Sequence, residues 1–319
     1  MTNGSVFANL ALEFVRVTES AAVASARWIG KGDGKAADKA AVDEMRERFN
    51  QIEFCGEVVI GEGEKDEAPE LYVGEHLGCG EGGAVFDIAV DPLECTDSVA
   101  YGRPNAMAVI ATGPKGTLYR AIDSYMEKIS VGKGAWGAID LDAPTADNIK
   151  KTAAALGKDV SEITVAVLDR PRHEQLIKEI RLSGARVQLF TDGDVAMAVA
   201  TCLEDSPVDM LMGIGGSTEA VLAAAALKCL GGEMLCRWKP KDEKHLARLS
   251  AAGITDLKKI FTVQDLARGD HITFTATGVI SGPLLQGVVF APRTIITHSV
   301  IMSSQPKEVR FLETRHAHE

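Results

Sequence analysis

The chain has 319 residues, of which 46% are hydrophobic and 25% are charged, and its formal net charge at pH 7 is -11. This acidic balance, without a basic stripe or a Lys/Arg run, argues against nucleic acid or an anionic membrane as the main partner. No window reaches the roughly 18 consecutive apolar residues of a membrane span. Residues 1–30 lack a signal-peptide pattern, so we expect a cytoplasmic protein.

The six cysteines show neither a CxxC pair nor a regular spacing. They stand at positions 55, 79, 95, 202, 229 and 236. We interpret them as reduced thiols, mostly small core residues, rather than a disulfide framework or a zinc site.

The N-terminal part of the chain is expected to begin with two helices. Apolar residues at near-helical spacing predict a long helix from about Leu10 to Trp28, which ends at the glycine-rich segment 30–34. A second helix is predicted over residues 36–50, with Asp38 in its first turn. A strand over residues 57–60 and an acidic loop over residues 61–64 follow.

The segment Val85 to Thr96 is the most informative part of the chain. Residues 85–90 form the near-continuous apolar run of a strand covered on both faces. Pro92 lacks an N–H group and is therefore expected to end the strand ladder. Asp91 and Glu94 then project from the carboxyl end of a central strand, where ligands bind in open α/β sheets. The segment predicts a cation site.

The rest of the chain alternates strands and helices. After a strand over residues 106–112 and half-exposed strands over 118–131, the pattern predicts strands 163–168, 186–190 and 208–212 and helices 172–183, 194–203 and 218–230. Such βα units imply a parallel sheet with right-handed crossovers. Strands 272–279, 285–290 and 294–302 are expected to close the structure. A soft boundary near residues 140–148 separates an N-terminal α+β half, 1–145, from a C-terminal α/β half, 146–319, packed tightly around a cleft.

Several carboxylates stand on turns next to strands or at helix starts, namely Asp38, Glu62, Glu64, Asp91, Glu94 and Glu219. A hard divalent cation such as Mg²⁺ or Mn²⁺ prefers oxygen ligands of this kind. Without a metal, converging carboxylates would raise one another's pKa values. Either these side chains bind cations or they do not converge, and for most of them taken singly a solvated turn is the commoner role. Asp91 differs, because a carboxylate at the end of an apolar strand needs a partner.

Thr96 stands at a predicted helix start. It is either an N-cap, as is common for threonine, or the hydroxyl that orients a metal-bound water beside a phosphate held by the helix N-terminus. The two interpretations are compatible, because a cap and a phosphate site use the same N–H groups.

Three loops that follow strands carry further candidates. The turn 213–216 has glycines but lacks the spacing of GxGxxG and of a P-loop, so we favour a close backbone approach with Glu219 entering the site. The loop 192–194 follows its strand in the same topological position, so both loops should open on one edge of the sheet. Arg170 and Arg172 suit phosphate recognition, although arginines are also common at exposed helix starts. His173 is interpreted as structural or exposed.

No Ser or Cys nucleophile has a suitable His and Asp companion, so covalent catalysis is not indicated.

The motif Asp91-Pro92-Leu93-Glu94-x-Thr96, with the loop 61–64 before it and Glu219 after a Gly-Ile-Gly-Gly turn, resembles the lithium-sensitive, metal-dependent sugar phosphatases. The resemblance is closest to class II fructose-1,6-bisphosphatases of the GlpX type. It extends to VTESAA at 17–22, VIGEGEKDEAP at 59–69, YMEK at 125–128 and DGDV at 192–195. The resemblance implies an α/β protein with the layered α/β/α/β/α sugar-phosphatase (inositol monophosphatase-like) fold. It also implies a homodimer or homotetramer.

The resemblance also implies roles for individual residues. The N-terminal half would carry most of the ligands of Mg²⁺ or Mn²⁺, which are Asp38, Glu62, Asp91, Glu94 and Glu219, with the Leu93 carbonyl as a further one. Asp38 and Thr96 would polarise the attacking water, with Glu62 beside them at the catalytic centre. The residues implied in substrate binding are Glu94, Cys95, Thr96, Tyr125, Arg170, Arg172, Asp192, Asp194 and Gly216. In this set the acidic pair Asp192 and Asp194 would bind sugar hydroxyls and the two arginines the distal phosphate.

The implied reaction is hydrolysis of the 1-phosphate of fructose 1,6-bisphosphate by metal-activated water, as in gluconeogenesis or the Calvin cycle. Sedoheptulose 1,7-bisphosphate is a second candidate substrate. Two alternatives stay open: another phosphatase of the superfamily, acting on inositol phosphate or a nucleotide bisphosphate, and a non-catalytic metabolite-binding relic. Arg170 and Arg172 favour a substrate with a second phosphate.

Two residues depart from the family pattern. Cys95 stands where the family has glycine, and if this position needs a positive φ, its side chain costs roughly 1 kcal/mol or more. A thiol beside metals is also open to oxidation. Gly34 stands where relatives tend to carry lysine, and the neighbouring Lys35 is the candidate to replace that contact.

Overall fold

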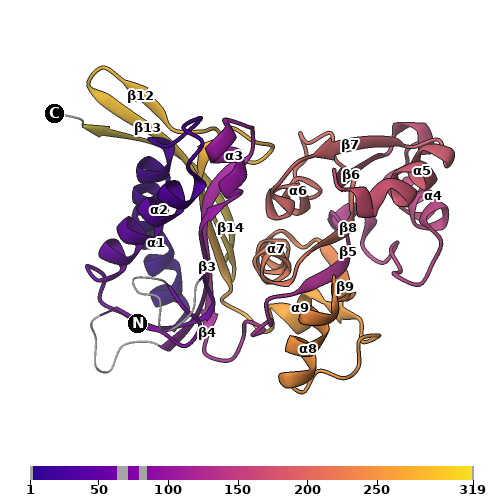
Figure 1. Ribbon diagram of the computed structural model, residues 1–319, viewed down its shortest axis with the longest axis horizontal. Helices are drawn as coiled ribbons and strands as arrows, with labels where there is room; N and C mark the ends of the chain where they lie inside the picture. The colour runs from indigo at the N-terminus through magenta and orange to yellow at the C-terminus, as the bar shows by residue number, and fades with distance from the viewer. Residues whose placement is uncertain (1–2, 63–70, 79–84, 318–319) are drawn as a thin grey trace. The chain divides into compact units, whose positions relative to one another are not determined.

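The computed structural model describes residues 3–62, 71–78 and 85–317. It divides into two compact units (Figure 1). Unit 1 comprises Met1–Arg120 and Ala267–Glu319, and unit 2 comprises Ala121–Leu266. This division differs from the one drawn at residue 145, because strand pairing joins segments that are distant in the sequence. The segment after Ala121 joins the sheet of unit 2, and the last strands return to the sheet of unit 1. The expected cleft stays a prediction.

Unit 1 contains helices α1 (Asn3–Ala26), α2 (Gly34–Phe49) and α3 (Thr96–Tyr101) and strands β1 (Cys55–Ile60), β2 (His76–Leu77), β3 (Val85–Glu94), β4 (Ala106–Pro114), β11 (Thr273–Ile280), β12 (Val289–Ala291), β13 (Thr294–Ser304) and β14 (Lys307–Ala317). The sheet order is β12-β13-β11-β4-β3-β1-β2, and β14 pairs with β13. Strands β1 and β3 are parallel, while β3, β4, β11 and β13 form antiparallel pairs.

Helices α1 and α2 lie side by side against one face of this sheet (Figure 1). The core beneath them is built on phenylalanines. Phe14 of α1 contacts Phe49 of α2 and Phe54 at ring-centroid distances of 5.8 and 5.4 Å, and Phe54 contacts Phe86 of β3 at 6.4 Å. Edge-to-face pairs of this kind add to the free energy of apolar burial. Phe49 and Phe86 lie at the end of α2 and the start of β3, and the same core extends to Ala37 and Leu93, which neighbour predicted site residues.

Unit 2 contains helices α4 (Thr145–Leu156), α5 (Glu174–Leu182), α6 (Asp194–Ala200), α7 (Ser217–Leu230), α8 (Glu243–Ala251) and α9 (Val263–Leu266) and strands β5 (Tyr125–Val131), β6 (Thr164–Leu168), β7 (Arg186–Phe190), β8 (Met210–Gly216), β9 (Glu233–Trp238) and β10 (Phe261–Thr262). Three short 3₁₀ turns span Lys133–Ala135, Val160–Glu162 and Pro171–His173. The sheet order is β10-β9-β5-β8-β6-β7.

The sheet of unit 2 carries helices on both faces, with α4 and α5 on one side and α6 and α7 on the other (Figure 1). On the α4/α5 side, Ile129, Val165 and Met210 of the strands pack against Ile149 and Ile180 of the helices. The next residues along the strands face the other side, because strand side chains alternate. Lys128 of β5 is one of these.

The βα pattern read from the sequence is confirmed. Strands β6, β7 and β8 are parallel, and each is followed by a helix close to its predicted position. Sequence reasoning missed β9, although its buried residues alternate along the strand, as well as β14 and α8. Most of the predicted strands over 118–124 and 285–288 are irregular, apart from one bridge between Leu118 and Ala267.

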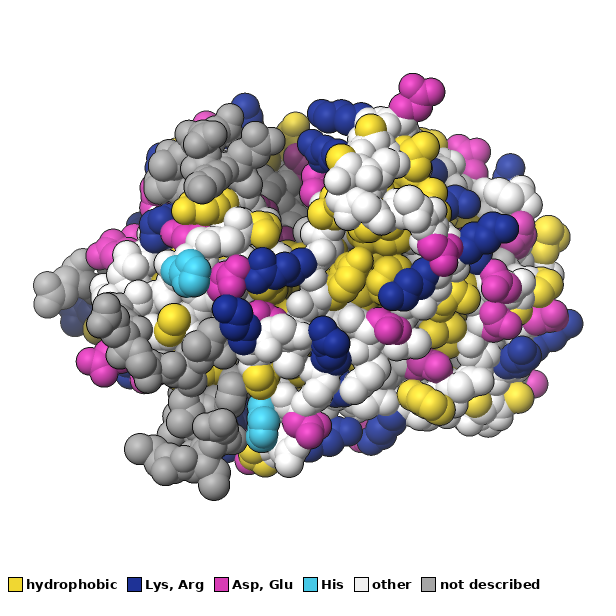
Figure 2. Space-filling view, turned by 90° about the horizontal axis from the view of Figure 1, so that it is seen from below, with side chains coloured by type: hydrophobic (Ala, Val, Ile, Leu, Met, Phe, Trp, Pro, Cys, Tyr) yellow, Lys and Arg dark blue, Asp and Glu magenta, His cyan; other side chains and the backbone are white. Residues whose placement is uncertain are grey.

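No helix in the described part of the chain combines the length and apolar character that crossing a bilayer requires. On the face shown in Figure 2, basic side chains lie singly or in small groups among acidic and uncharged ones.

Candidate functional site

The turn between β3 and α3 is held by short-range hydrogen bonds. The Leu93 N–H donates to Asp91 Oδ1 (3.1 Å), and the Thr96 hydroxyl donates to the Leu93 carbonyl (3.2 Å). Pro92 was predicted to end β3, and this prediction is wrong, because the strand continues to Glu94. The missing N–H coincides instead with a register shift between Asp91 and Glu94 in the pairing with β4. The motif therefore forms a compact turn on a strand with irregular pairing.

Cys95 occupies the left-handed region, with φ of 75° and ψ of 50°. The condition on which the cost of Cys95 depends, a positive φ, is therefore met, and a non-glycine residue is strained here. Cys95 is also the N-cap residue of α3, which makes Thr96 the first helical residue rather than the cap. The Thr96 side chain bonds back to the preceding turn instead.

The start of α2 lies next to this turn. Asp33 caps the helix, and its Oδ1 accepts from the Ala36 N–H (3.0 Å). The helix begins two residues earlier than predicted, so Asp38 lies in its second turn. A Cβ on Gly34 would lie 3.0 Å from Thr96 Cγ2, so this departure from the family pattern allows close packing on Thr96.

Glu62 follows β1, and its N–H donates to the Leu71 carbonyl (3.1 Å). Glu64 lies outside the described residues. In unit 1, Asp38 lies in the second turn of α2, Asp91 near the carboxyl end of β3, and Thr96 at the start of α3.

In unit 2, the three loops that follow the parallel strands β6, β8 and β7 contact one another. Arg170, after β6, forms an ion pair with Asp192, after β7 (2.7 Å). Arg172 donates from Nη2 and Nε to the Ile214 carbonyl of β8 (2.7 and 3.2 Å). The prediction that these loops open on one edge of the sheet is confirmed.

His173 connects these loops rather than acting as an exposed group. Its Nε2 accepts from the Ile214 N–H (2.7 Å), so Nδ1 carries the proton and donates to the Leu168 carbonyl (2.7 Å). The side chain is 1% exposed. Burial lowers the pKa of His173, and Arg172 and Arg170 lower it further, while the bond to Leu168 opposes them. The structural interpretation of this residue is confirmed.

The glycines of the Gly-Ile-Gly-Gly turn make room for carboxylates. A Cβ on Gly215 would lie 2.0 Å from Asp194 Oδ2, and a Cβ on Gly216 would lie 1.9 Å from Glu219 Oε2. Both contacts are far inside van der Waals range. The turn backbone therefore lies close to the Glu219 carboxylate, while the entry of Glu219 into a ligand site stays a prediction. Thr218 donates to Glu219 Oε2 (2.8 Å).

Lys128 of β5 is the residue of this group that sequence reasoning did not single out. Its Nζ lies 2.7 Å from Asp194 Oδ2, and the two side chains are 3% and 11% exposed. Lys128 stands in a segment that the sequence predicts as half-exposed strand, where a charged residue carries little signal. Burial raises the pKa of Glu219, the charge of Asp194 raises it further, and Lys128 opposes both. Lys128 therefore offsets the charge of two buried carboxylates.

Comparison with known proteins matches residues 8–316 to a model of bacterial fructose-1,6-bisphosphatase, glpX-encoded. The chain belongs to this family. It is 47% identical to fructose-1,6-bisphosphatase 1 class 2 of Escherichia coli K12 over 320 aligned positions, which cover 96% of this chain and 95% of the relative. The class 2 enzymes of Escherichia coli O6:H1 and Shigella flexneri show the same identity and coverage.

A solved structure, an extragenic suppressor from Pyrococcus furiosus, matches 56% of this chain and 63% of its own, with 14% identity and a TM-score of 0.28. That similarity is too low to carry an argument.

The glpX family is one of metal-dependent phosphatases. The predicted ligand set takes four carboxylates from unit 1, namely Asp38, Glu62, Asp91 and Glu94, and Glu219 from unit 2. Among the residues that the structure describes, no group of three or more His, Cys, Asp or Glu is placed to hold a metal ion. The donor chemistry nevertheless fits a hard cation, because every predicted ligand is a carboxylate.

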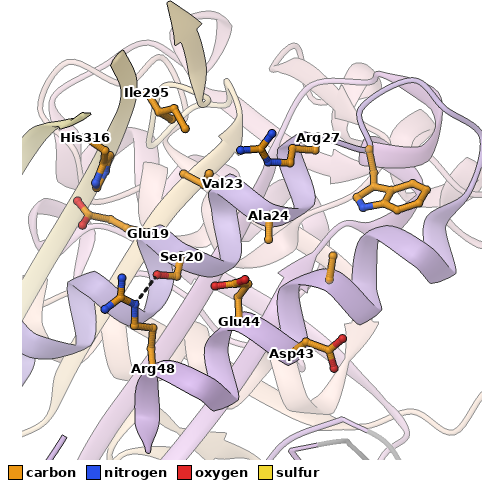
Figure 3. Close-up of a pocket in the computed structure, with 12 residues that line it drawn as sticks. Glu19, Ser20, Val23, Ala24, Arg27, Asp43, Glu44, Arg48, Ile295 and His316 are labelled. Carbon is orange, nitrogen blue, oxygen red and sulfur yellow. Dashed lines mark hydrogen bonds between the residues drawn. The ribbon is translucent and has the colours of Figure 1, made fainter. Parts of the chain in front are cut away.

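A pocket of about 500 Å³ in unit 1 contains none of the predicted site residues (Figure 3). It lies between α1, α2 and the strands β13 and β14. Its wall combines the carboxylates of Glu19, Asp43 and Glu44 with Arg27 and Arg48, and Arg48 donates to the Ser20 hydroxyl (3.0 Å). This mixed charge points to no single class of ligand.

Proposed function

We propose that this chain hydrolyses the 1-phosphate of fructose 1,6-bisphosphate to give fructose 6-phosphate and phosphate. Family membership, at 47% identity to class 2 fructose-1,6-bisphosphatases, supports the activity. The observation that carries the substrate class is the joining of three loops at one edge of the unit 2 sheet, where Arg170 contacts Asp192 and Arg172 contacts the Ile214 carbonyl. Carboxylates suit sugar hydroxyls, and arginines suit a second phosphate.

In this proposal Asp38, Glu62, Asp91, Glu94 and Glu219 would hold Mg²⁺ or Mn²⁺, with the Leu93 carbonyl as a further ligand. The bound cation would stabilise charge on the reacting phosphoryl group and make the attacking water more acidic. The backbones of these carboxylates are set by the first turns of α2, the residues after β1, the end of β3 and the start of α7. Sedoheptulose 1,7-bisphosphate, which carries the same two terminal phosphates, is a second proposed substrate.

Thr96 and Asp38 would orient the attacking water. The Thr96 hydroxyl donates its proton to the Leu93 carbonyl, so its lone pairs are left to accept a hydrogen bond from water. Asp38 would take the proton that the water loses. The strained backbone at Cys95 holds Thr96 at the first position of α3.

Tyr125, Arg170, Arg172, Asp192, Asp194 and Gly216 would bind the sugar and its distal phosphate. The ion pairs of Asp192 with Arg170 and of Asp194 with Lys128 fix both carboxylates before substrate binds. Pre-ordered groups reduce the entropy lost on binding. We also propose that the chain forms a homodimer or homotetramer.

The Thr96→Ala variant tests the assignment of the water-orienting pair. We expect kcat for fructose 1,6-bisphosphate to fall about 100-fold or more, because positioned proton transfer contributes that much. The Kd for fructose 6-phosphate should stay near that of the parent. Thr117→Ala is the matched control, since the Thr117 hydroxyl also donates to a carbonyl three residues earlier, that of Pro114 (2.6 Å). A full-rate Thr96→Ala enzyme would remove Thr96 from the mechanism.

A further inference from the structure

Two cationic side chains approach the ring of Tyr125, the first residue of β5. The Arg172 guanidinium carbon lies 5.3 Å from the ring centroid, and Lys241 Nζ lies 5.7 Å from it. Both distances are within the range of a cation–π contact. Tyr125 is fixed between strands, because it pairs with Gly216 of β8 and its carbonyl accepts from the Lys239 N–H (2.8 Å).

Neither cation has a carboxylate partner within ion-pair distance among the residues that the structure describes. Arg172 donates from Nε and Nη2 to the Ile214 carbonyl. The nearby ion pair with Asp192 is formed by Arg170 instead. Two positive charges gathered at one ring repel each other. Asp194 attracts Arg172 and Asp242 attracts Lys241, but no ion pair joins either carboxylate to its cation. In a chain of net charge -11, two cations without a direct carboxylate contact are the arrangement expected where an anion binds.

Lys241 is placed by the start of α8. The adjacent Asp242 caps this helix, and its Oδ1 accepts from the His245 N–H (3.0 Å) and lies 2.7 Å from His245 Nδ1. The His245 ring packs edge-on against Tyr125, at a centroid distance of 5.4 Å. The backbone that carries Lys241 is thus attached to Tyr125 through Asp242 and His245.

We propose that Lys241 acts with Arg172 and Tyr125 to bind the distal phosphate of the sugar bisphosphate. The inference deepens the proposed function and rests on it, by adding a specificity residue to the phosphate end of the substrate. The chemistry is complementary: the guanidinium offers a planar fork, the ammonium a compact charge, and the phenol an O–H donor. A phosphate dianion in this position would relieve the repulsion between the two cations.

Calorimetric titration with fructose 6-phosphate is the test, because this ligand carries the distal phosphate alone and needs no turnover. We expect Lys241→Gln to weaken its binding about tenfold, the size of one charge-assisted hydrogen bond. Lys241→Arg should bind near the parent affinity. Lys244→Gln is the matched control, because Lys244 is also exposed, lies three residues further along in the first turn of α8 and carries the same charge. Equal affinities for Lys241→Gln and Lys244→Gln would overturn the inference.

Turnover gives a second readout that a purely structural role would not move. With Mn²⁺ present, Lys241→Gln should raise KM for fructose 1,6-bisphosphate and leave kcat/KM for fructose 1-phosphate, which lacks the distal phosphate, unchanged. Equal losses on both substrates would contradict the assignment. If the parent protein binds fructose 6-phosphate in a Lys241-dependent way but hydrolyses neither substrate, the proposed function fails and the anion site stands.

Discussion

The Lys128 ammonium lies 2.7 Å from the Asp194 carboxylate, and both side chains are almost completely buried in unit 2. The pair joins the middle of β5 to the first residue of α6, against the face of Gly215. Removing one member of a buried ion pair leaves an uncompensated charge, which costs more than the pair contributes. Lys128 is therefore central to the stability of the loop that carries Asp194.

Replacing Lys128 with methionine should lower the free energy of unfolding by about 3 kcal/mol, because Asp194 is left buried without its cation. Urea denaturation followed by circular dichroism measures the change. Lys128→Met/Asp194→Asn should recover most of the loss, since no charge is then left unpaired. If Lys128→Met alone unfolds at the parent urea concentration, the pair does not have this role.

Gly216→Ala should reduce kcat with Mn²⁺ about 100-fold, since displacing a site group by about 1 Å costs that much. The added Cβ would lie 1.9 Å from Glu219 Oε2, so the carboxylate has to move. Gly134→Ala is the control: its Cβ would meet only the end of the Leu156 side chain, at 3.0 Å. Similar rates for both variants would show that the position of Glu219 is not critical.

His173 should make the stability of the protein depend on pH. Its folded-state pKa lies below the ordinary value of 6.5, chiefly through burial. Above that value both states are neutral at this residue, and its contribution is fully present. As the pH falls below it, the unfolded chain binds the proton first, so stability drops by up to about 1.4 kcal/mol per pH unit until the folded-state pKa is reached.

The matched comparison for this effect is His173→Asn, which cannot bridge Leu168 and Ile214 and does not titrate. Unfolding free energies at about pH 7.5 and about pH 5.5, on either side of the free histidine pKa, should converge between parent and variant at the lower pH. Contributions from other titrating groups cancel in the difference. A gap that stays constant with pH would contradict the burial of a neutral His173.

Cys95→Gly should raise the free energy of unfolding by about 1 kcal/mol, because glycine accepts the left-handed backbone without a steric penalty. Cys55→Gly, made in strand β1, should lower it by a similar amount, because glycine weakens a strand. Thermal unfolding of the two variants beside the parent measures both shifts. A destabilised Cys95→Gly would show that contacts of the thiol outweigh the backbone strain.

The regular part of the fold follows from local sequence patterns. The parallel strands β6, β7 and β8 and their helices could be read from the alternation of apolar runs, because each unit has its own period and its own turn residues. Strand β14 could not, since its exposed residues carry no apolar alternation. The division into units was also out of reach, because it depends on pairing between β4 and β11, which lie far apart in the sequence.

In the candidate site, too, residues marked by a local sequence pattern could be predicted, and residues whose role depends on distant contacts could not. Asp91 and Glu219 could be singled out because a strand end and a glycine turn mark them. Lys128 and Lys241 could not, because their roles depend on Asp194 and Tyr125, which only the folded chain brings next to them. The positive φ at Cys95 could be posed from the sequence only as a condition, and the structure shows it.

Release of phosphate by the purified chain tests the central proposal most directly. Fructose 1,6-bisphosphate, sedoheptulose 1,7-bisphosphate and inositol 1-phosphate would be assayed with Mn²⁺ and again after chelation of the metal. We expect metal-dependent release from fructose 1,6-bisphosphate, with little or none from inositol 1-phosphate, since the latter has no second phosphate for Arg172 to bind. No release from fructose 1,6-bisphosphate with Mn²⁺ present, or a rate unchanged by chelation, would contradict the account.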